Sequence, residues 1–447
     1  MSLPGAFLAA GRGVATRNEI SATAFRIAQA AAWFVSGRLI LLRLGQEEYG
    51  FMSVMFSIAG WLQMFDLGIT SYLRTELPKV RALSGADEAA RYYKRAVLGT
   101  VATAGLLLLA GNALLQGFPS FDRSLLGLLS SQAVVSPHEF GLVVAGLSAY
   151  SLILLCSNLQ QAYLAADGRQ YVLFLLGICG CVMQPLAIWW VTGAHWSLPS
   201  VFALFCIAPV VPTLGYFVYT AAASFPSIGP APQFKLRNGI TTSFFLTQIG
   251  AAIGGNLDLI LVSHFFGLTD AAVYSIFKLL VQFPISVHAQ FNMQSWPMYA
   301  LFSTSQADFA RIRHLIARNS RIAIWASLIL VIALAGAGPW FVRLWSKGTL
   351  TGPLPTALLF ALYGSLFMLS NTFMILMYAF NYTRAILPTM YGVLPCLVLL
   401  VWLLRGMGPD SVVLSNAITV ALGLAVGVTF YLRKVRAVAP SAAAAEA

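Results

Sequence analysis

Several ionisable residues lie inside long apolar stretches of this sequence, where a charge is costly to bury. They are Arg26, Arg38, Asp66, Asp258, Lys278 and His288. A charged side chain at the centre of a bilayer costs at least about 2.5 kcal/mol, so it normally faces a partner or a water-filled cavity. These positions are therefore the ones best suited to bind an ion, hold a charged ligand or carry a proton.

Symmetry about two short turns predicts how four of these residues pair. Asp258 and Lys278 each lie ten residues from Leu268, and Arg26 and Asp66 are placed evenly about the turn near residues 46 and 47. Antiparallel helices of equal rise bring such positions to the same depth. We therefore predict the ion pairs Arg26–Asp66 and Asp258–Lys278. The alternative is that these pairs only join helices.

The remaining two residues have simpler alternatives. The Arg38 side chain could extend along its helix to the membrane surface, and a lone histidine such as His288 is more often a satisfied polar group than a proton carrier. Together the three cations outnumber the two carboxylates in the interior. Such a balance favours an anionic ligand such as a phosphate.

Composition explains why the surroundings of these residues are apolar. The hydrophobic fraction is 59%, the charged fraction is 9% and the mean hydropathy is +0.79. Soluble domains carry about 25% charged residues, so the chain is expected to be an all-α integral membrane protein. We predict twelve spans, at 20–43, 49–73, 96–116, 139–165, 171–192, 198–220, 239–265, 271–300, 320–340, 354–380, 385–404 and 411–432.

The distribution of positive charge predicts the orientation. With these spans, nineteen of the 27 Lys and Arg residues fall on one side of the membrane. The other side carries Arg43, Arg123, Arg343, Lys347 and Arg405. Cytoplasmic loops carry the excess of Lys and Arg, so both ends of the chain are expected in the cytoplasm. The net charge of +12 is spread over loops, which indicates anionic lipid rather than nucleic acid.

The two halves of the chain resemble each other. Gly45, Glu48 and Ser53 recur as Gly267, Asp270 and Ser275, and the stretch from Ser157 to Gly177 is echoed from Ser370 to Gly392. Six spans per half make the repeats parallel, related by a pseudo-two-fold axis along the membrane normal. We expect an N-terminal lobe at 1–223, a proline-containing cytoplasmic linker at 224–238, a C-terminal lobe at 239–435 and a tail at 436–447.

Motifs for enzymatic chemistry are missing from the sequence. It contains no nucleotide-binding loop, no His-Glu zinc motif and no nucleophile constellation, and its five cysteines are spaced for neither a zinc site nor a disulfide framework. We therefore expect no cofactor, no metal site and no enzymatic activity.

The two segments at the starts of the halves resemble a known family. The residues from Leu44 to Phe51, those from Phe65 to Ile69, and Asn256-Leu257-Asp258 with Phe266-Gly267 are similar to polysaccharide flippases of the Wzx type. These belong to the multidrug/oligosaccharidyl-lipid/polysaccharide exporter (MOP) superfamily. The similarity in layout covers nearly the whole chain.

The resemblance implies two six-helix lobes around a central cavity in a bacterial inner membrane. It implies translocation of a polyprenyl-pyrophosphate-linked oligosaccharide to the outer leaflet by alternating access, alone or with other polysaccharide-assembly membrane proteins. Arg26, Arg38 and Lys278 would then meet the substrate, while Asp66, Asp258 and His288 would serve ion pairing or coupling. A cation-coupled multidrug or metabolite exporter is the alternative, and a membrane scaffold without transport is a third class.

Overall fold

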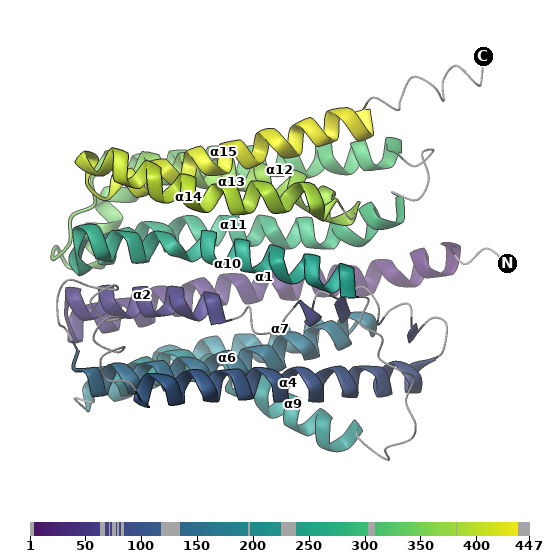
Figure 1. The fold of residues 1–447 in the computed structure, drawn as a ribbon, viewed down its shortest axis with the longest axis horizontal. Coiled ribbons are helices and arrows are strands. Elements are labelled where there is room, and N and C mark those ends of the chain that lie inside the picture. Colours follow the sequence, from purple (N-terminus) through teal and green to yellow (C-terminus); the bar gives the residue numbers. More distant parts are fainter. Residues whose placement is uncertain are drawn as a thin grey trace. The chain divides into compact units, whose positions relative to one another are not determined.

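The described residues fold almost entirely into helices, and within each half of the chain these helices run along one another (Figure 1). A computed structural model describes residues 4–62, 68–70, 72–73, 77, 80–81, 85–117, 135–194, 197–224, 238–302, 309–380 and 382–436. Helices suit such an apolar chain because a bilayer offers no partner to an open backbone N–H or C=O group. The chain divides into two compact units, Met1–Ala252 and Ile253–Ala447, and the division falls within one helix, α10.

The first unit contains the helices of the N-terminal half. They are α1 (Pro4–Arg43), α2 (Gln46–Leu62), α4 (Ala86–Gly117), α6 (Pro137–Ala166), α7 (Tyr171–Gly193), α8 (Leu198–Ile207), the 3-10 turn η2 (Ala208–Val210) and α9 (Val211–Ser224). Helix α1 packs along α7, and α6 packs on α4 and α8. The capping box formed by Ser136 and Glu139 starts α6, because each side chain accepts a backbone N–H of the other residue.

The second unit contains the helices of the C-terminal half. They are α10 (Asn238–Phe266), α11 (Leu268–Phe302), α12 (Phe309–Trp345), α13 (Leu354–Ala379), α14 (Thr383–Leu404), the 3-10 turn η4 (Arg405–Met407), α15 (Asp410–Tyr431) and the π-helical turn η5 (Leu432–Arg436). Helix α13 is central, since it packs against α11, α12 and α15. Helix α10 enters this unit with its C-terminal part, from Ile253 onward.

The predicted spans agree with the helices over much of the chain. Within the described residues, nine helices are long and apolar enough to cross a membrane. They are Ile20–Arg43, Ala86–Ala113, Pro137–Ala165, Tyr171–Gly193, Leu198–Thr220, Leu268–Met293, Phe309–Trp345, Leu354–Ala379 and Asp410–Val435. Two shorter apolar helices, Ile253–Phe266 and Tyr391–Met407, coincide with two further predicted spans. The chain is thus a multi-pass membrane protein by helix length and composition, and the total of twelve stays a prediction.

Several boundaries differ from the predicted ones. The span predicted at 96–116 belongs to a helix that begins at Ala86, and the span predicted at 320–340 lies inside α12. The first turns of both helices contain charged residues. A hydropathy reading excludes these residues from the span, although they are helical. The predicted span 49–73 begins in α2 and continues into residues of which only some are described.

The two turns singled out by the internal repeat share one backbone geometry. Gly45 and Gly267 both have positive φ, at 125° and 98°, and each carbonyl accepts the N–H of the residue four positions on. A positive φ favours glycine because it lacks a Cβ. The repeated glycines therefore produce the same tight helix-to-helix turn at the start of each half.

Close packing in the first unit depends on Gly180. A Cβ at this position in α7 would collide with the backbone carbonyl of Pro209, in the 3-10 turn η2. Proline lacks a backbone N–H, and at this proline the 3-10 turn η2 separates α8 from α9. The group that approaches α7 here is thus backbone rather than a flexible side chain.

We predict that Gly180→Ala lowers the melting temperature of the detergent-purified protein. Forcing a methyl group into a packed site typically costs about 1–3 kcal/mol, and a backbone carbonyl cannot rotate away. The matched control is Gly105→Ala in α4, where an added Cβ meets no described atom within 4 Å. Equal melting temperatures for the two variants would contradict the close approach.

Candidate functional site

The predicted ion pair between Asp258 and Lys278 is present in the second unit. Lys278 Nζ on α11 lies 2.7 Å from Asp258 Oδ1 on α10. The Asp258 side chain is 3% exposed and the Lys278 side chain is 16% exposed. The turn at Gly267 places the two residues at the same level of neighbouring antiparallel helices, as the equal sequence distances require. Their roles in binding or coupling stay predictions.

The carboxylate of Asp258 is held from several directions. Besides Lys278, its Oδ1 accepts the backbone N–H of Leu259 at 2.9 Å, and its Oδ2 accepts the hydroxyl of Tyr274 at 3.0 Å. The Tyr274 hydroxyl in turn accepts from Asn416 Nδ2 on α15 at 3.4 Å. The charged group therefore joins three helices, α10, α11 and α15, and neither carboxylate oxygen is left unused.

The ammonium of Lys278 retains capacity for another partner. It donates to Asp258 and to the backbone carbonyl of Gly255 at 3.0 Å. A lysine ammonium has three N–H donors, so these contacts within the described residues occupy two of them. Because the side chain is partly exposed, the third donor can reach water or an anionic ligand.

His288 lies in a second buried polar cluster, between α11, α12 and α13. Its Nε2 is 3.4 Å from the carbonyl oxygen of Asn319, and its Nδ1 is 3.4 Å from Asn292 Nδ2. Asn292 Nδ2 also donates to Thr372 Oγ1 at 3.4 Å. The imidazole is thus a hydrogen-bonded group in the interior, as expected if His288 is a satisfied polar residue rather than a proton carrier. A role in ion coupling stays a prediction.

The same cluster continues through Asn319. Its Nδ2 donates to Ser295 Oγ at 3.0 Å and to the Tyr299 hydroxyl at 3.2 Å, and all three side chains are buried. Asn319 Oδ1 and Asn292 Oδ1 have no hydrogen-bond partner within the described part of the chain. Unused acceptors in an apolar interior can accept from a water or from a protonated histidine.

Sequence reasoning missed this cluster because its members other than His288 are uncharged. A usable signal was nevertheless present in their spacing. His288, Asn292, Ser295 and Tyr299 follow one another at intervals of four, three and four residues. That spacing places polar groups on one face of a helix, and a polar face inside an apolar span indicates a buried partner.

The two cations of the first unit that we predicted to bind substrate, Arg26 and Arg38, lie on α1. Arg26 is half-buried, donates to Gln29 Oε1 at 2.8 Å and stacks on the Phe25 ring at 5.5 Å. Arg38 is half-buried three turns further along. Asp66 lies outside the described residues, so the structure does not test its predicted pairing with Arg26.

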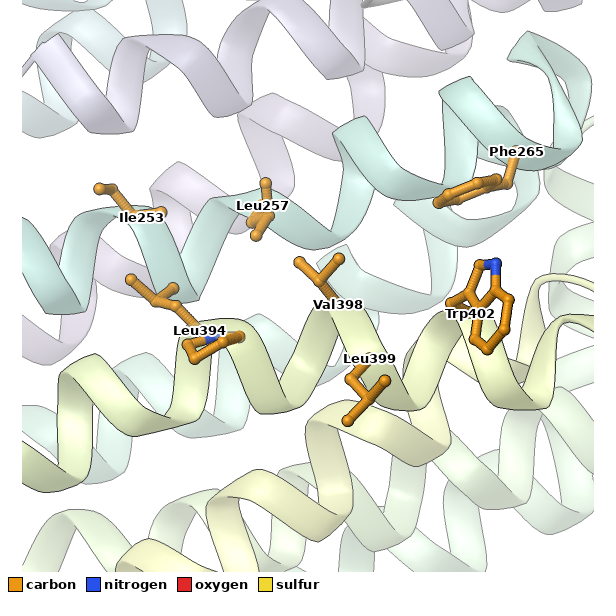
Figure 2. A pocket seen from close by; sticks show the side chains of 8 residues that line it. Ile253, Leu257, Phe265, Leu394, Val398, Leu399 and Trp402 are labelled. Atoms are coloured by element: carbon orange, nitrogen blue, oxygen red, sulfur yellow. The ribbon is translucent and has the colours of Figure 1, made fainter.

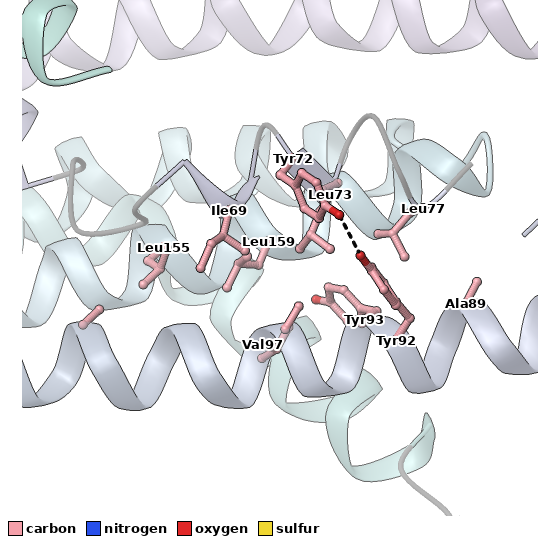
Figure 3. Close-up of a cluster of buried hydrophobic side chains, with 13 residues drawn as sticks. Ile69, Tyr72, Leu73, Leu77, Ala89, Tyr92, Tyr93, Val97, Leu155 and Leu159 are labelled. Carbon is pink, nitrogen blue, oxygen red and sulfur yellow. Dashed lines mark hydrogen bonds between the residues drawn. The ribbon is translucent and has the colours of Figure 1, made fainter. Parts of the chain in front are cut away.

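The described residues that follow Asp66 are anchored in the core of the first unit. Ile69, Leu73 and Leu77 pack against α4 and α6, and Tyr92 on α4 donates to the Tyr72 hydroxyl at 3.4 Å (Figure 3). Leu73 and Leu77 are fully buried. The described part of the segment after Asp66 therefore contributes fully buried leucines to the core of this unit.

A further polar contact at the start of α7 escaped the sequence analysis. Asn18 on α1 accepts the N–H of Tyr171 at 3.0 Å through Oδ1, and donates to the carbonyl of Gly168 at 3.4 Å. Arg17 lies over the Tyr171 ring at 5.2 Å, and Arg81 forms an ion pair with Asp167. Asn18 thus caps α7 from another helix, which short-range motifs cannot reveal.

Comparisons with known proteins assign the fold. No protein-family model and no curated protein matches the sequence. A multidrug resistance MATE family transporter of the MOP superfamily, solved in an inward-facing conformation, matches with a TM-score of 0.70 at 12% identity, covering 94% of this chain and 99% of that chain. The chain has the fold of the MOP-superfamily transporters.

Two further solved structures share this MOP fold. The lipid II flippase MurJ, in an inward closed conformation, matches with a TM-score of 0.67 at 12% identity, covering 91% of this chain and 86% of that chain. A MOP superfamily transporter from Pyrococcus furiosus with reverse polarity of its binding pocket matches at 0.64 and 12% identity, covering 95% and 96%. The MOP fold thus occurs in both a lipid flippase and multidrug transporters.

We predict that Lys278→Met strongly destabilises the protein, whereas adding Asp258→Asn restores most of the loss. Removing one partner leaves an uncompensated buried charge, which costs about 3–5 kcal/mol. The asparagine is neutral and still accepts from Tyr274. Melting temperatures of both singles and the double variant test this coupling. A double variant less stable than Lys278→Met alone would show that the pair does not dominate the energetics of this site.

Proposed function

We propose that this protein is a flippase that moves a polyprenyl-pyrophosphate-linked oligosaccharide from the cytoplasmic to the outer leaflet by alternating access. The observation that carries the proposal is the available N–H of the partly exposed Lys278 ammonium beside a fully engaged Asp258 carboxylate. Pyrophosphate is an anion, and a charge-assisted hydrogen bond from an ammonium stabilises it strongly away from water. The occurrence of the MOP fold in a lipid II flippase supports the same substrate class.

The cations of α1 add to this support. Arg26 and Arg38 lie within the span Ile20–Arg43, where a positive charge is costly unless it serves a partner or a cavity. Guanidinium groups bind phosphates through two parallel N–H donors, which an ammonium cannot do. We therefore propose Arg26 and Arg38 as phosphate-binding residues of the first unit, in addition to Lys278 in the second.

Energy coupling is assigned to groups already in the interior. The sequence has no nucleotide-binding loop, so an ion gradient, the membrane potential or removal of product must drive net movement. Asp258 and His288 are the proposed coupling groups in the second unit, and Asp66 in the first. A substrate or ion can shift the conformational equilibrium only through its different affinities for the two states.

The cellular setting follows from the same proposal. A bacterial inner membrane is the expected location, and the excess of Lys and Arg on one side favours a cytoplasmic position for both chain ends. Other polysaccharide-assembly membrane proteins are the expected partners.

A cation-coupled multidrug or metabolite exporter is the second candidate. Its support is the fold likeness to a multidrug resistance MATE family transporter. An exporter of organic cations would require an available carboxylate to bind its substrate. Asp258 does not supply one in this conformation, because Lys278, Tyr274 and Leu259 already donate to both of its oxygens.

Ligand-induced thermal stabilisation separates the two candidates. A ligand that binds only the folded state at 100 times its Kd stabilises that state by about 2.7 kcal/mol. We expect a saccharide-bearing polyprenyl pyrophosphate to raise the melting temperature of the purified protein, and Arg38→Gln and Lys278→Gln each to reduce that rise. The matched control is Lys347→Gln, an exposed cation outside the proposed site.

The opposite pattern would decide for the exporter. Stabilisation by lipophilic cations alone, lost in Asp258→Asn, would reject the flippase. Transport in proteoliposomes completes the test, since a flippase must move the labelled polyprenyl-linked saccharide between leaflets while Lys347→Gln remains active.

A further inference from the structure

An apolar groove runs between α10 and α14 in the second unit (Figure 2). It has a volume of about 530 Å³ and is lined by Ile253, Leu257, Phe265, Leu394, Pro395, Val398, Leu399 and Trp402. Every lining side chain is hydrocarbon apart from the indole nitrogen. The indole N–H of Trp402 is thus the one side-chain hydrogen-bonding group in this lining, so the occupant must be predominantly hydrocarbon.

The groove is long and follows the helix axes. Phe265 and Trp402 lie together at one end, whereas Ile253 and Leu394 lie at the other (Figure 2). From Ile253 to Phe265 helix α10 rises about 18 Å at 1.5 Å per residue. This length is more than half of the roughly 30 Å hydrocarbon core of a bilayer. A chain lying in the groove would thus run across the membrane rather than along it.

The groove is also open at its side. Val398 is 42% exposed and Trp402 is 53% exposed. A flexible chain can therefore enter laterally, without passing through a closed entrance.

The corresponding helices of the first unit show what is missing here. In the proposed internal repeat, α10 and α14 are the counterparts of α1 and α7, and Gly392 is the counterpart of Gly177. Helices α1 and α7 pack along each other, and the Phe25 ring fills the space at Gly177. In the second unit an added Cβ at Gly392 would meet no described atom within 4 Å, and the apolar groove lies between the two counterpart helices. The pair α10 and α14 therefore has room for an external hydrocarbon chain, whereas the equivalent pair α1 and α7 is packed together.

A cation marks one end of the groove. The Arg405 guanidinium, in the turn after α14, lies over the Trp402 ring at 5.6 Å. Tryptophan next to arginine at the end of an apolar helix is typical of the membrane interface. An amphiphile whose chain fills the groove would have its headgroup near Arg405, which favours an anionic headgroup.

From these features we infer that the groove binds the polyprenyl chain of the lipid-linked substrate, with the phosphate end directed toward Arg405. This inference rests on the proposed flippase function and extends it to the lipid part of the substrate. One groove with one terminal cation suits a single-chain amphiphile, whereas a phospholipid has two chains to accommodate. The saccharide plays no part in this contact, so a polyprenyl monophosphate suffices as a probe.

Native mass spectrometry of the full chain can measure this binding. The probe is undecaprenyl phosphate, with dioleoyl phosphatidylglycerol as the competing two-chain anionic lipid. We expect Val398→Trp, which places a large side chain in the groove, to weaken binding of the probe at least tenfold. The matched control is Leu403→Trp, on the same helix at a residue that is 59% exposed and does not line the groove.

Two further arms address the headgroup and the occupant. Arg405→Gln is expected to weaken binding of undecaprenyl phosphate severalfold and to leave binding of the uncharged undecaprenol unchanged. Equal probe binding by Val398→Trp and Leu403→Trp would overturn the inference. So would displacement of the probe by phosphatidylglycerol at equal concentration, because the groove would then hold ordinary membrane lipid.

Transport separates this inference from the proposed function. If wild-type protein and Val398→Trp move the polyprenyl-linked saccharide at the same rate, the proposed flippase function is supported and the assignment of the groove is rejected. If wild-type protein moves no such lipid although Val398→Trp abolishes probe binding, the proposed function is rejected, whereas the groove is still supported as a polyprenyl-binding site.

Discussion

The ion pair between Asp258 and Lys278 is the contact on which the arrangement of the second unit depends. A carboxylate in an apolar interior is strongly unfavourable unless an opposite charge and hydrogen-bond donors surround it. Here those donors come from α11 directly and, through Tyr274, from Asn416 on α15. Helix α10 therefore cannot slide or rotate far relative to α11 without exposing a charge to hydrocarbon. Any conformational change that moves these helices must carry the cluster as one body or provide it with new partners, such as water or substrate.

The neutral cluster around His288 follows the same rule with weaker forces. Its amide, hydroxyl and imidazole groups connect α11, α12 and α13 through hydrogen bonds of 3.0–3.4 Å, and two amide oxygens within it remain unused. A neutral network with spare acceptors costs less to rearrange than an ion pair does. The second unit thus combines a firmly fixed charged cluster with a more adaptable polar one, both reached from α11. This combination suits a protein whose helices must stay associated while their inner faces change.

Sequence reasoning succeeded where one strong physical term determined the outcome. Hydropathy located most of the spans, and the cost of a buried charge together with equal distances from the turn identified Asp258–Lys278. It failed where the structure depends on several weak hydrogen bonds between neutral side chains. Asn292, Asn319 and Thr372 carry no charge and are common in ordinary helices, so their burial together could not be predicted. It also failed for contacts made in three dimensions between distant segments, such as the capping of α7 by Asn18 and the groove between α10 and α14. A groove is defined by missing packing, and no residue type signals missing packing.

Helix α10 has two chemically different neighbours, and this difference matters for an amphiphilic substrate. Asp258 and Gly255 connect it to the Lys278 ammonium on α11, while Leu257, one residue before Asp258, lines the apolar groove toward α14. A carrier that offered only cations would bind a free phosphate as readily as a lipid phosphate. A carrier that offered only an apolar groove would fill with the surrounding lipid. Offering both kinds of contact selects a phosphorylated lipid over either competitor, because each competitor satisfies only one of them. Specificity of this kind needs no tight individual contact, since it arises from the sum of two modest binding energies.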